Sequence, residues 1–251
     1  MPGMIELRLE DHPERMTNVL LECKIDGGRF EWNGKSLISE RGIVRNDRFP
    51  HIIAELQQMD WHCRGEVAVP FAHVTDLNAS ENWGKARFYM FDMWKFEGED
   101  TRNASTADNR HLIEKAFSQA PRFKNLRYPF RWKDFQTGWA YVLKHKLEGL
   151  VMKELNGTGK QFKVKRYTEV KVPVVGLEAG AVKGAFLVLL NGVTCKVSAL
   201  SADNVAKYKA MLKANIEPWA EVEYLFLTKN NIMFQPRLRD LDTRQEILSL
   251  P

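Results

Sequence analysis

The stretch Glu22-Cys23-Lys24-Ile25-Asp26-Gly27-Gly28-Arg29 is the most informative part of this sequence. It places Lys24 two residues before a carboxylate and a glycine turn, with Arg29 just beyond the turn. A lysine amine becomes a good nucleophile only when burial or neighbouring cations lower its pKa. A Lys-x-Asp-Gly match occurs by chance in about one chain in twenty of this length. The weight of Lys24 therefore depends on the segments that accompany it.

The hydrophobic pattern around this motif predicts strands joined by the glycine turn. Residues 19–44 read as strand, turn and strand, because apolar runs flank Gly27-Gly28 and then Asn33-Gly34. Apolar residues at helical spacing predict a helix over 49–59. Further strands are expected at 66–71, 87–94 and 149–153, and a second helix from the N-cap residue Asp134 to about residue 146.

The hydrophobic pattern of the sequence changes after Arg166. Beyond this point there are short β-type runs and a single helical stretch, 202–213. Short strands with one helix are typical of a small barrel such as the OB-fold. We therefore expect a boundary at 166–170, with one domain over 1–166 and a second over 167–251. The strands expected in the second domain are 170–177, 185–191, 193–197, 220–227 and 232–234.

The composition is that of an ordinary globular protein that works inside the cell. Of the 251 residues, 44% are hydrophobic and 27% charged, and the net charge of +5 fits an anionic partner without requiring one. Cys23, Cys63 and Cys195 are too far apart for a disulfide framework or a zinc site. No apolar run approaches membrane-spanning length, and the N-terminus is not signal-like. We expect a cytoplasmic monomer without a membrane partner.

Four further segments that carry charged or aromatic groups follow Lys24 along the chain. Side chains two residues apart in a strand point the same way, so Lys163 and Lys165 can hold phosphate oxygens together and lower the pKa of Lys24 by like-charge repulsion. A carboxylate can bind the Mg²⁺ that neutralises phosphate charge, and an aromatic ring can stack on a purine. With a lysine nucleophile, these groups indicate nucleotidyl transfer. The segments are Arg64-Gly65-Glu66-Val67, Phe88-Tyr89-Met90-Phe91-Asp92, Glu148-Gly149-Leu150-Val151-Met152-Lys153 and Phe162-Lys163-Val164-Lys165-Arg166.

Each of these residues also has a plain structural explanation. Phe91 is an aromatic in a predicted strand, and such side chains usually belong to the core. Glu66 and Glu148 can be solvated strand-end carboxylates, and the lysine pair can be the polar face of an edge strand. The functional hypothesis therefore rests on the ordered set rather than on any single residue.

In this order, the motif and the four segments resemble the covalent nucleotidyltransferases, most closely the ATP-dependent DNA ligases, over about residues 20–240. The resemblance implies an α+β fold, in which a nucleotidyltransferase (adenylation) domain of two antiparallel sheets with flanking helices precedes an OB-fold barrel. It implies ATP and Mg²⁺ as cofactors and nicked double-stranded DNA as the substrate. It also implies a lysyl–AMP intermediate, from which AMP passes to the 5′-phosphate of the nick before the 3′-OH seals it.

The same resemblance implies a role for each matching residue. Lys24 is the residue that becomes adenylated. The other roles are adenine recognition by Glu22 and the backbone at Cys23, ribose and phosphate contacts by Arg29, a ribose contact by Glu66, base stacking by Phe91, metal binding by Glu148 and Glu66, and phosphate binding by Lys163 and Lys165.

Two motifs depart from the family pattern. Where the family shows Ser-Arg-x-Gly, this chain has Ser39-Glu40-Arg41-Gly42, so Arg41, the candidate for the 5′-phosphate, is displaced by one position. The segment 236–242 resembles the arginine-rich closing motif of the family but has Asp242 in place of the usual lysine. Arg237 and Arg239 are expected to help eject pyrophosphate, with Arg239 assigned to ATP and Arg237 to DNA.

A basic and aromatic segment, 121–133, contains no acidic residue. Cations interleaved with aromatic rings suit a nucleic-acid backbone, so Lys124, Arg127 and Arg131 are candidate DNA contacts. The alternative, of equal weight, is a loop that its aromatic side chains anchor and whose cations are solvated.

Other functions stay open at this point. An RNA ligase of the same superfamily shares the catalytic motifs, and an mRNA-capping guanylyltransferase shares them with GTP as the nucleotide. The barrel-like second half favours DNA over RNA, because many RNA ligases lack it. A non-catalytic DNA-binding module would not need the lysine, the Glu148 carboxylate and the lysine pair together.

Overall fold

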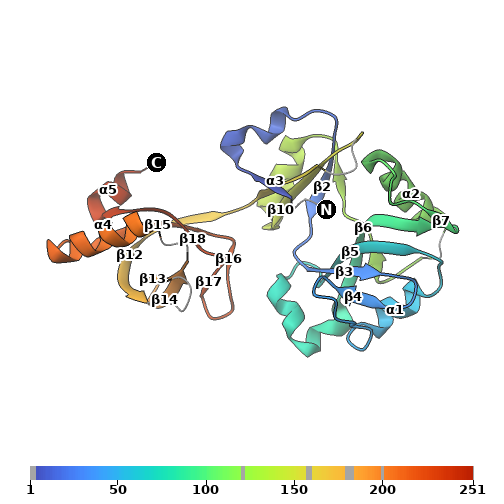
Figure 1. Ribbon diagram of the computed structural model, residues 1–251, viewed down its shortest axis with the longest axis horizontal. Helices are drawn as coiled ribbons and strands as arrows, with labels where there is room; N and C mark the ends of the chain where they lie inside the picture. Colours follow the sequence, from blue (N-terminus) through green and yellow to red (C-terminus); the bar gives the residue numbers. More distant parts are fainter. Residues whose placement is uncertain (1–3, 120–121, 157–159, 179–183, 199–200, 251) are drawn as a thin grey trace. The chain divides into compact units, whose positions relative to one another are not determined.

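The computed structural model describes residues 4–119, 122–156, 160–178, 184–198 and 201–250. The chain divides into two compact units, Met1–Arg166 and Tyr167–Pro251 (Figure 1). Within the described part, no helix is long and apolar enough to span a membrane.

The first sheet of unit 1 has the strand order β1-β11-β10-β2-β9. Helix α3 (Phe135–His145) packs on it through Val142, which contributes to a small core with Leu150 and Met152. Asp134 begins this helix by accepting a 2.7 Å hydrogen bond from the Thr137 N–H. The strands are β1 Ile5–Leu7, β2 Val19–Lys24, β9 Arg131–Trp132, β10 Gly149–Glu154 and β11 Gln161–Lys165.

The second sheet has the order β4-β3-β5-β6-β7, with β8 also paired to β6. It contributes to the larger core of unit 1, which includes the fully buried Trp32 and Phe88 and which helices α1 and α2 help to build. The strands are β3 Gly28–Trp32, β4 Leu37–Ser39, β5 His62–Ala68, β6 Arg87–Phe96, β7 Glu99–Asp100 and β8 Leu126–Arg127, and the helices are α1 Pro50–Leu56 and α2 Thr106–Gln119. Short 3₁₀ turns are Leu9–Asp11, Pro13–Arg15, Val74–Asn78 and Ser80–Lys85.

The strands on either side of the glycine turn do not pair with each other. β2 is hydrogen-bonded to β10 on one side and to β9 on the other, so it has no edge left for β3, which opens the second sheet. At the crossing, a Cβ on Gly27 would lie 2.5 Å from the Val67 carbonyl oxygen, so a side chain there would collide with β5. The motif that contains Lys24 therefore joins the two sheets.

Three further expectations for unit 1 are corrected. The sheets are not purely antiparallel, because β1 pairs with β11 and β8 with β6 in parallel. The strand expected at 66–71 is β5, His62–Ala68, and the chain turns away at Phe71, which has a left-handed backbone with φ 59°. The helix expected over 49–59 is α1, Pro50–Leu56.

Unit 2 contains a sheet in the order β14-β13-β12-β15-β18. β12 pairs with β15 through residues 168–173 and with β13 through residues 174–178, with a bulge between Val174 and Gly176. A parallel bridge between Ser198 and Arg237 connects the end of β14 to β18, so the two edges of the sheet meet. The elements are β12 Thr168–Glu178, β13 Ala185–Leu190, β14 Val193–Val197, α4 Ala202–Lys213, β15 Pro218–Tyr224, β16 Phe226–Leu227, β17 Met233–Phe234, β18 Arg237–Thr243 and α5 Arg244–Ser249.

Three features of unit 2 differ from the sequence prediction. The run 220–227 forms two strands, β15 and β16, instead of one. β18 was missed because its sequence is rich in charge, and α5 was missed because it is only six residues long.

Candidate active site

Lys24, Glu148 and Lys165 come together at the ends of three adjacent strands. Gly149 in β10 lies opposite Lys24 in β2 on one side and opposite Lys165 in β11 on the other. Lys24 Nζ donates a 2.8 Å hydrogen bond to Glu148 Oε2, and Lys165 Nζ lies 3.3 Å from Glu148 Oε1. The three side chains are only 9–11% exposed. The register of β10 therefore brings two cations to one buried carboxylate.

Gly149 lets these strands approach closely. A Cβ at this position would lie 2.0 Å from the Val164 carbonyl oxygen, and the backbone φ of +155° is rare for other residues. Any side chain would push β10 away from β11 and separate Glu148 from Lys165. The Glu-Gly pair is thus a geometric requirement of the cluster.

The pKa of Lys24 is raised, which corrects the expectation that the lysine pair lowers it. Burial by itself acts to lower the pKa, but the charges of Glu148, Glu66 and Asp26 outweigh it. The Glu148 carboxylate is in direct contact, and a hydrogen bond to the charged amine stabilises its protonated form. Lys24 therefore carries a proton in this state and must lose it before it can act as a nucleophile.

Two further carboxylates act on Lys24. Burial raises the pKa of Glu66 to about 7, although the charge of Lys24 acts in the opposite direction. Burial likewise raises the pKa of Asp26, whose carboxylate accepts hydrogen bonds from His73 Nδ1 (3.0 Å) and the Val74 N–H (3.2 Å). The acid of the Lys-x-Asp-Gly motif is thus fixed to the turn after β5.

Glu22 belongs to a buried charge cluster that the sequence did not reveal. Its Oε1 accepts a 2.7 Å hydrogen bond from Arg110 in α2, and its Oε2 lies 2.8 Å from Lys153 Nζ in β10. All three side chains are at most 8% exposed. Arg110 is 88 residues from Glu22, so no local spacing could have identified it.

Phe91 lies beside two cations that extend over its ring. Arg29 Cζ is 5.9 Å and Lys153 Nζ 5.3 Å from the ring centroid, and Lys153 also donates to the Phe91 carbonyl. Two neighbouring hollows, of about 250 and 30 Å³, share Glu22, Phe91 and Lys153 as lining residues, and the smaller one also reaches Lys24. Phe91 is therefore a ring at the wall of a hollow that extends to Lys24.

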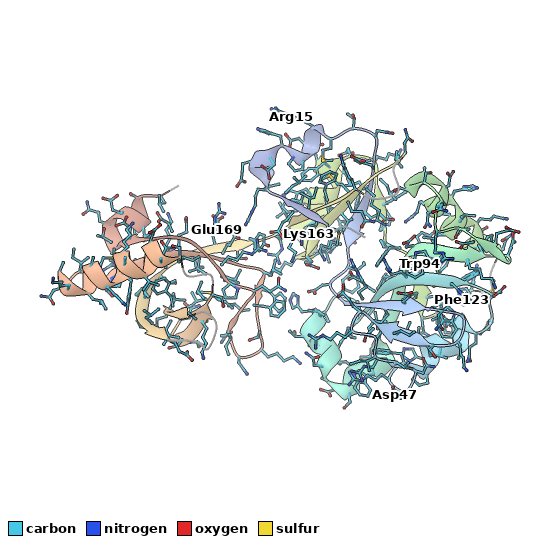
Figure 2. All side chains as sticks on the ribbon, viewed as in Figure 1. Arg15, Asp47, Trp94, Phe123, Lys163 and Glu169 are labelled. Carbon is cyan, nitrogen blue, oxygen red and sulfur yellow. The ribbon has the colours of Figure 1, made fainter. Side chains whose placement is uncertain are left out.

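The remaining residues assigned to the nucleotide are all in contact with other groups. Lys163 on β11 (Figure 2) has its Nζ 3.5 Å from Glu6 Oε2 on β1. The Cys23 N–H donates to the Phe130 carbonyl at 2.9 Å, and burial, aided by Glu148, raises the pKa of its thiol to about 11.

The displaced arginine motif forms an exposed turn. Gly42 N–H donates to the Ser39 carbonyl, and Gly42 has a left-handed φ of +76°. Arg41 is exposed and is not among the residues that line the hollows at Phe91. The residue at the family's arginine position, Glu40, lies 3.5 Å from Arg29 instead.

In the basic segment, Pro121 lies outside the described residues, and the three candidate DNA contacts have different surroundings. Lys124 is exposed, and its backbone N–H donates to Glu55. Arg127 NH1 donates to the carbonyls of Phe123 and Leu126, both at 2.7 Å. Arg131 is 59% exposed and lies 3.6 Å from Glu114.

Within unit 2, Arg237 and Arg239 lie on either side of a buried carboxylate. Their nitrogens are 3.8 and 3.7 Å from Glu223, which is only 1% exposed. Asp242, which stands where the family has lysine, pairs with Lys207 in α4 at 2.5 Å. The two arginines are thus oriented by β15, and Asp242 has a structural partner of its own.

The fold has counterparts among solved structures. A Lig E DNA ligase is 16% identical and has a TM-score of 0.70, with 96% of this chain and 100% of that chain covered. The ligase domain of LigD from M. tuberculosis is 18% identical (TM-score 0.55, 97% of each chain), and a mycobacterial DNA ligase D complexed with ATP is 20% identical (TM-score 0.52, 91% of each chain). The chain has the fold of a minimal DNA ligase. No family model and no curated protein sequence matches it.

At these identities the likeness concerns the fold alone: it supports the ligase-type mixed α and β fold that the ordered motifs predicted. It does not assign a role to any residue. The chemistry must therefore be argued from the contacts of Lys24 and its neighbours.

Proposed function

We propose that this protein is an ATP-dependent DNA ligase that seals 3′-OH/5′-phosphate nicks in duplex DNA through a lysyl–AMP intermediate. The observation that carries the proposal is the buried Lys24–Glu148–Lys165 cluster in a chain with a DNA ligase fold. The cluster supplies a nucleophile, a cation for phosphate oxygens and a carboxylate, which are the groups that covalent phosphoryl transfer uses.

The reaction has three phosphoryl-transfer steps. Lys24 Nζ attacks the α-phosphorus of ATP, the P–N bond forms, and the bond to pyrophosphate breaks. A nonbridging oxygen of the DNA 5′-phosphate then attacks the same phosphorus and displaces Lys24, which leaves AMP on the DNA end. The 3′-OH finally attacks the DNA phosphorus, forms the phosphodiester and expels AMP. Lys24, which donates a hydrogen bond to Glu148 Oε2 in this state, would release its proton to solvent before the first attack.

The residues near Lys24 also fit a magnesium ion. The described residues hold no cluster of three His, Cys, Asp or Glu side chains suited to a metal. Mg²⁺ at phosphoryl-transfer sites, however, is usually held by one or two carboxylates together with substrate phosphates. Glu66 Oε2 is buried and makes no hydrogen bond in the described part of the chain, so with Glu148 it would hold the ion. The ion would neutralise charge on the phosphate oxygens.

For the nucleotide, we propose that adenine stacks on Phe91 near Glu22, with Arg29 and Glu66 at the ribose. The phosphates would then meet Lys163 and Lys165, whose present partners are carboxylates that phosphate oxygens can replace. Lys153 and Arg110 would hold the Glu22 carboxylate in its orientation.

Unit 2 is proposed to be an OB-fold. Its strands follow the order of that fold, with β12, β13 and β14 before helix α4 and with β15 and β18 after it, and its edges meet at Ser198 and Arg237. Arg239 and Arg237 on β18 would contact ATP and DNA respectively, and Arg41, Lys124, Arg127 and Arg131 of unit 1 would contact the DNA backbone.

The test is incubation with α-labelled ATP or GTP and Mg²⁺, followed by nicked DNA or nicked RNA. We expect label from ATP on the wild type and on Lys35→Ala, an exposed-lysine control, but not on Lys24→Ala. Nicked DNA should then release the label as AMP. Label from GTP alone would contradict ATP as the nucleotide, and sealing of RNA alone would contradict DNA as the substrate. The absence of label would refute the proposal that the protein is an enzyme of this kind.

A further inference from the structure

Exposed aromatic side chains gather at one cleft beside Lys24. Among the Phe, Tyr and Trp residues that the structure describes, only Phe71, Phe130 and Tyr141 are exposed. All three line a cleft of about 630 Å³ that also contains Lys24 and Glu148. Aromatic rings left in water at one place, next to a reactive group, indicate a surface that a ligand covers.

Two of these rings belong to a continuous row of tilted aromatic rings in contact. The ring centroids of Phe130 and Trp132 are 4.6 Å apart, those of Trp132 and Tyr141 4.8 Å, and those of Tyr141 and His145 4.0 Å. Trp132 lies in β9, and Tyr141 and His145 lie in α3, so the row of rings is fixed to the first sheet and to the helix that covers it. Phe130, at one end, is 64% exposed.

The second sheet contributes a strained aromatic to the same cleft. Phe71 follows β5 in a left-handed backbone conformation, with φ 59°, and its ring is 88% exposed. This conformation is unfavourable for a bulky residue, and no core packing rewards it. Strain of this kind is typical of positions that meet a ligand.

Cations accompany the rings. Arg87 at the start of β6 and Arg127 in β8 both line the cleft, and Arg127 is fixed by its hydrogen bonds to two backbone carbonyls. Aromatic platforms beside fixed cations are the usual means of binding unpaired bases together with their phosphates.

We propose that this cleft binds an unpaired nucleotide at the DNA end that is being joined. Its base would stack on the Phe130–Trp132–Tyr141–His145 rings, and its phosphate would lie near Arg87 and Arg127. Phe91, the proposed adenine platform, does not line this cleft, whereas Lys24 lines both the cleft and the pocket at Phe91. The reactive lysine thus lies between a place for the nucleotide and a place for the DNA end. This inference rests on the proposed ligase function.

An unpaired nucleotide fits better than a paired one for a simple reason. Within a duplex, both faces of each base are covered by its neighbours. Such a base has no free face on which the aromatic side chains of the cleft could stack. A base outside the stack presents a free face, and stacking on an aromatic side chain is tolerant of sequence. The proposed substrate class is therefore nicks or ends with a frayed or unpaired terminal nucleotide.

The test is binding measured by fluorescence anisotropy, without ATP, to two labelled nicked duplexes. One is fully paired, and in the other the 3′-terminal nucleotide at the nick is unpaired. We expect wild type to bind the unpaired form more tightly. Phe130→Leu combined with Tyr141→Leu should lose affinity for that form by about tenfold and lose little for the paired nick. Phe130→Tyr with Tyr141→Phe, which keeps both rings, should retain the preference.

Two further variants guard against misfolding. Phe71→Asn removes an exposed ring at a left-handed position that Asn tolerates, so the fold is retained and the preference should fall. Leu143 lies on α3, like Tyr141, but does not line the cleft, so Leu143→Ala should change the affinity for neither duplex. Equal losses on both duplexes, or no loss, would overturn the inference. Adenylation of wild-type Lys24 is measured separately. If adenylation fails, the proposed ligase function is refuted, and the binding measurement still tests the cleft.

Discussion

Lys24 and Glu148 form a 2.8 Å hydrogen bond across two neighbouring strands, and this contact keeps the lysine protonated. Glu148→Gln removes the negative charge while it keeps the shape. Burial and the nearby Lys165 should then lower the pKa of Lys24. We expect the variant to react with a small acylating reagent at Lys24 at lower pH than wild type, as measured by mass spectrometry.

Glu6→Gln is the matched control, because Glu6 pairs with Lys163 at 3.5 Å, whereas the carboxylates that raise the pKa of Lys24 are Glu148, Glu66 and Asp26. It should leave the labelling profile of Lys24 unchanged. Identical profiles for wild type and Glu148→Gln would show that the carboxylate does not hold the proton on Lys24.

Glu66 should make stability depend on pH. Its pKa is about 7 in the folded state, mainly because burial disfavours the charged form, whereas the ordinary value for a glutamate is 4.5. The folded protein therefore binds more protons than the unfolded chain between these values, so the free energy of unfolding should fall as the pH rises from about 4.5 to 7. The loss is at most about 3 kcal/mol.

Glu66→Gln cannot ionise and should escape that loss. Urea unfolding near pH 5 and near pH 8 would measure it: the variant should gain stability relative to wild type at the higher pH. A difference between the two proteins that does not change with pH would contradict the assignment.

The sequence predicts the elements of this fold better than their pairing. The run before Lys24 and the run after Gly28 are strands as predicted, yet they enter different sheets, because β2 is already paired on both sides. Pairing partners depend on contacts between distant segments, which local periodicity does not encode. The strand at 237–243 was missed for a related reason, since its charged residues hide the alternation that the sheet imposes.

The candidate site shows the same division. Ordered motifs brought Lys24, Glu148 and Lys165 into one hypothesis, and the register at Gly149 places them together. Arg110 has no motif, because its role arises only when the folded chain brings its side chain from α2 to Glu22 in β2. The direction of the pKa shift of Lys24 also cannot be predicted from the sequence, because it depends on the distances from Lys24 to three carboxylates.

Glu55 is a structural support for the basic segment that carries no motif either. It lies in α1, and its carboxylate accepts hydrogen bonds from the N–H groups of Lys124, Asn125 and Leu126 at 2.9–3.2 Å. Glu55→Ala leaves these donors without their acceptor, which should cost about 2–3 kcal/mol in the free energy of unfolding. Gln58→Ala, near the end of the same helix, should cost less than about 0.5 kcal/mol. Equal urea midpoints for the two variants would contradict this role.

Arg110 should contribute far more to the free energy of unfolding than its more exposed partner Glu114 does. It is 6% exposed and donates to Glu22 at 2.7 Å and to the Pro129 carbonyl at 3.0 Å. Arg110→Met leaves the buried Glu22 with Lys153 alone, and removal of one partner from a buried ion pair costs about 3–5 kcal/mol. The remaining pair with Lys153 places the expected loss at the low end, about 3 kcal/mol.

Glu114→Gln removes only the 33% exposed partner of Arg110 and should cost less than about 1 kcal/mol. Urea unfolding of both variants measures the difference, and similar losses would mean that Glu22 does not depend on Arg110.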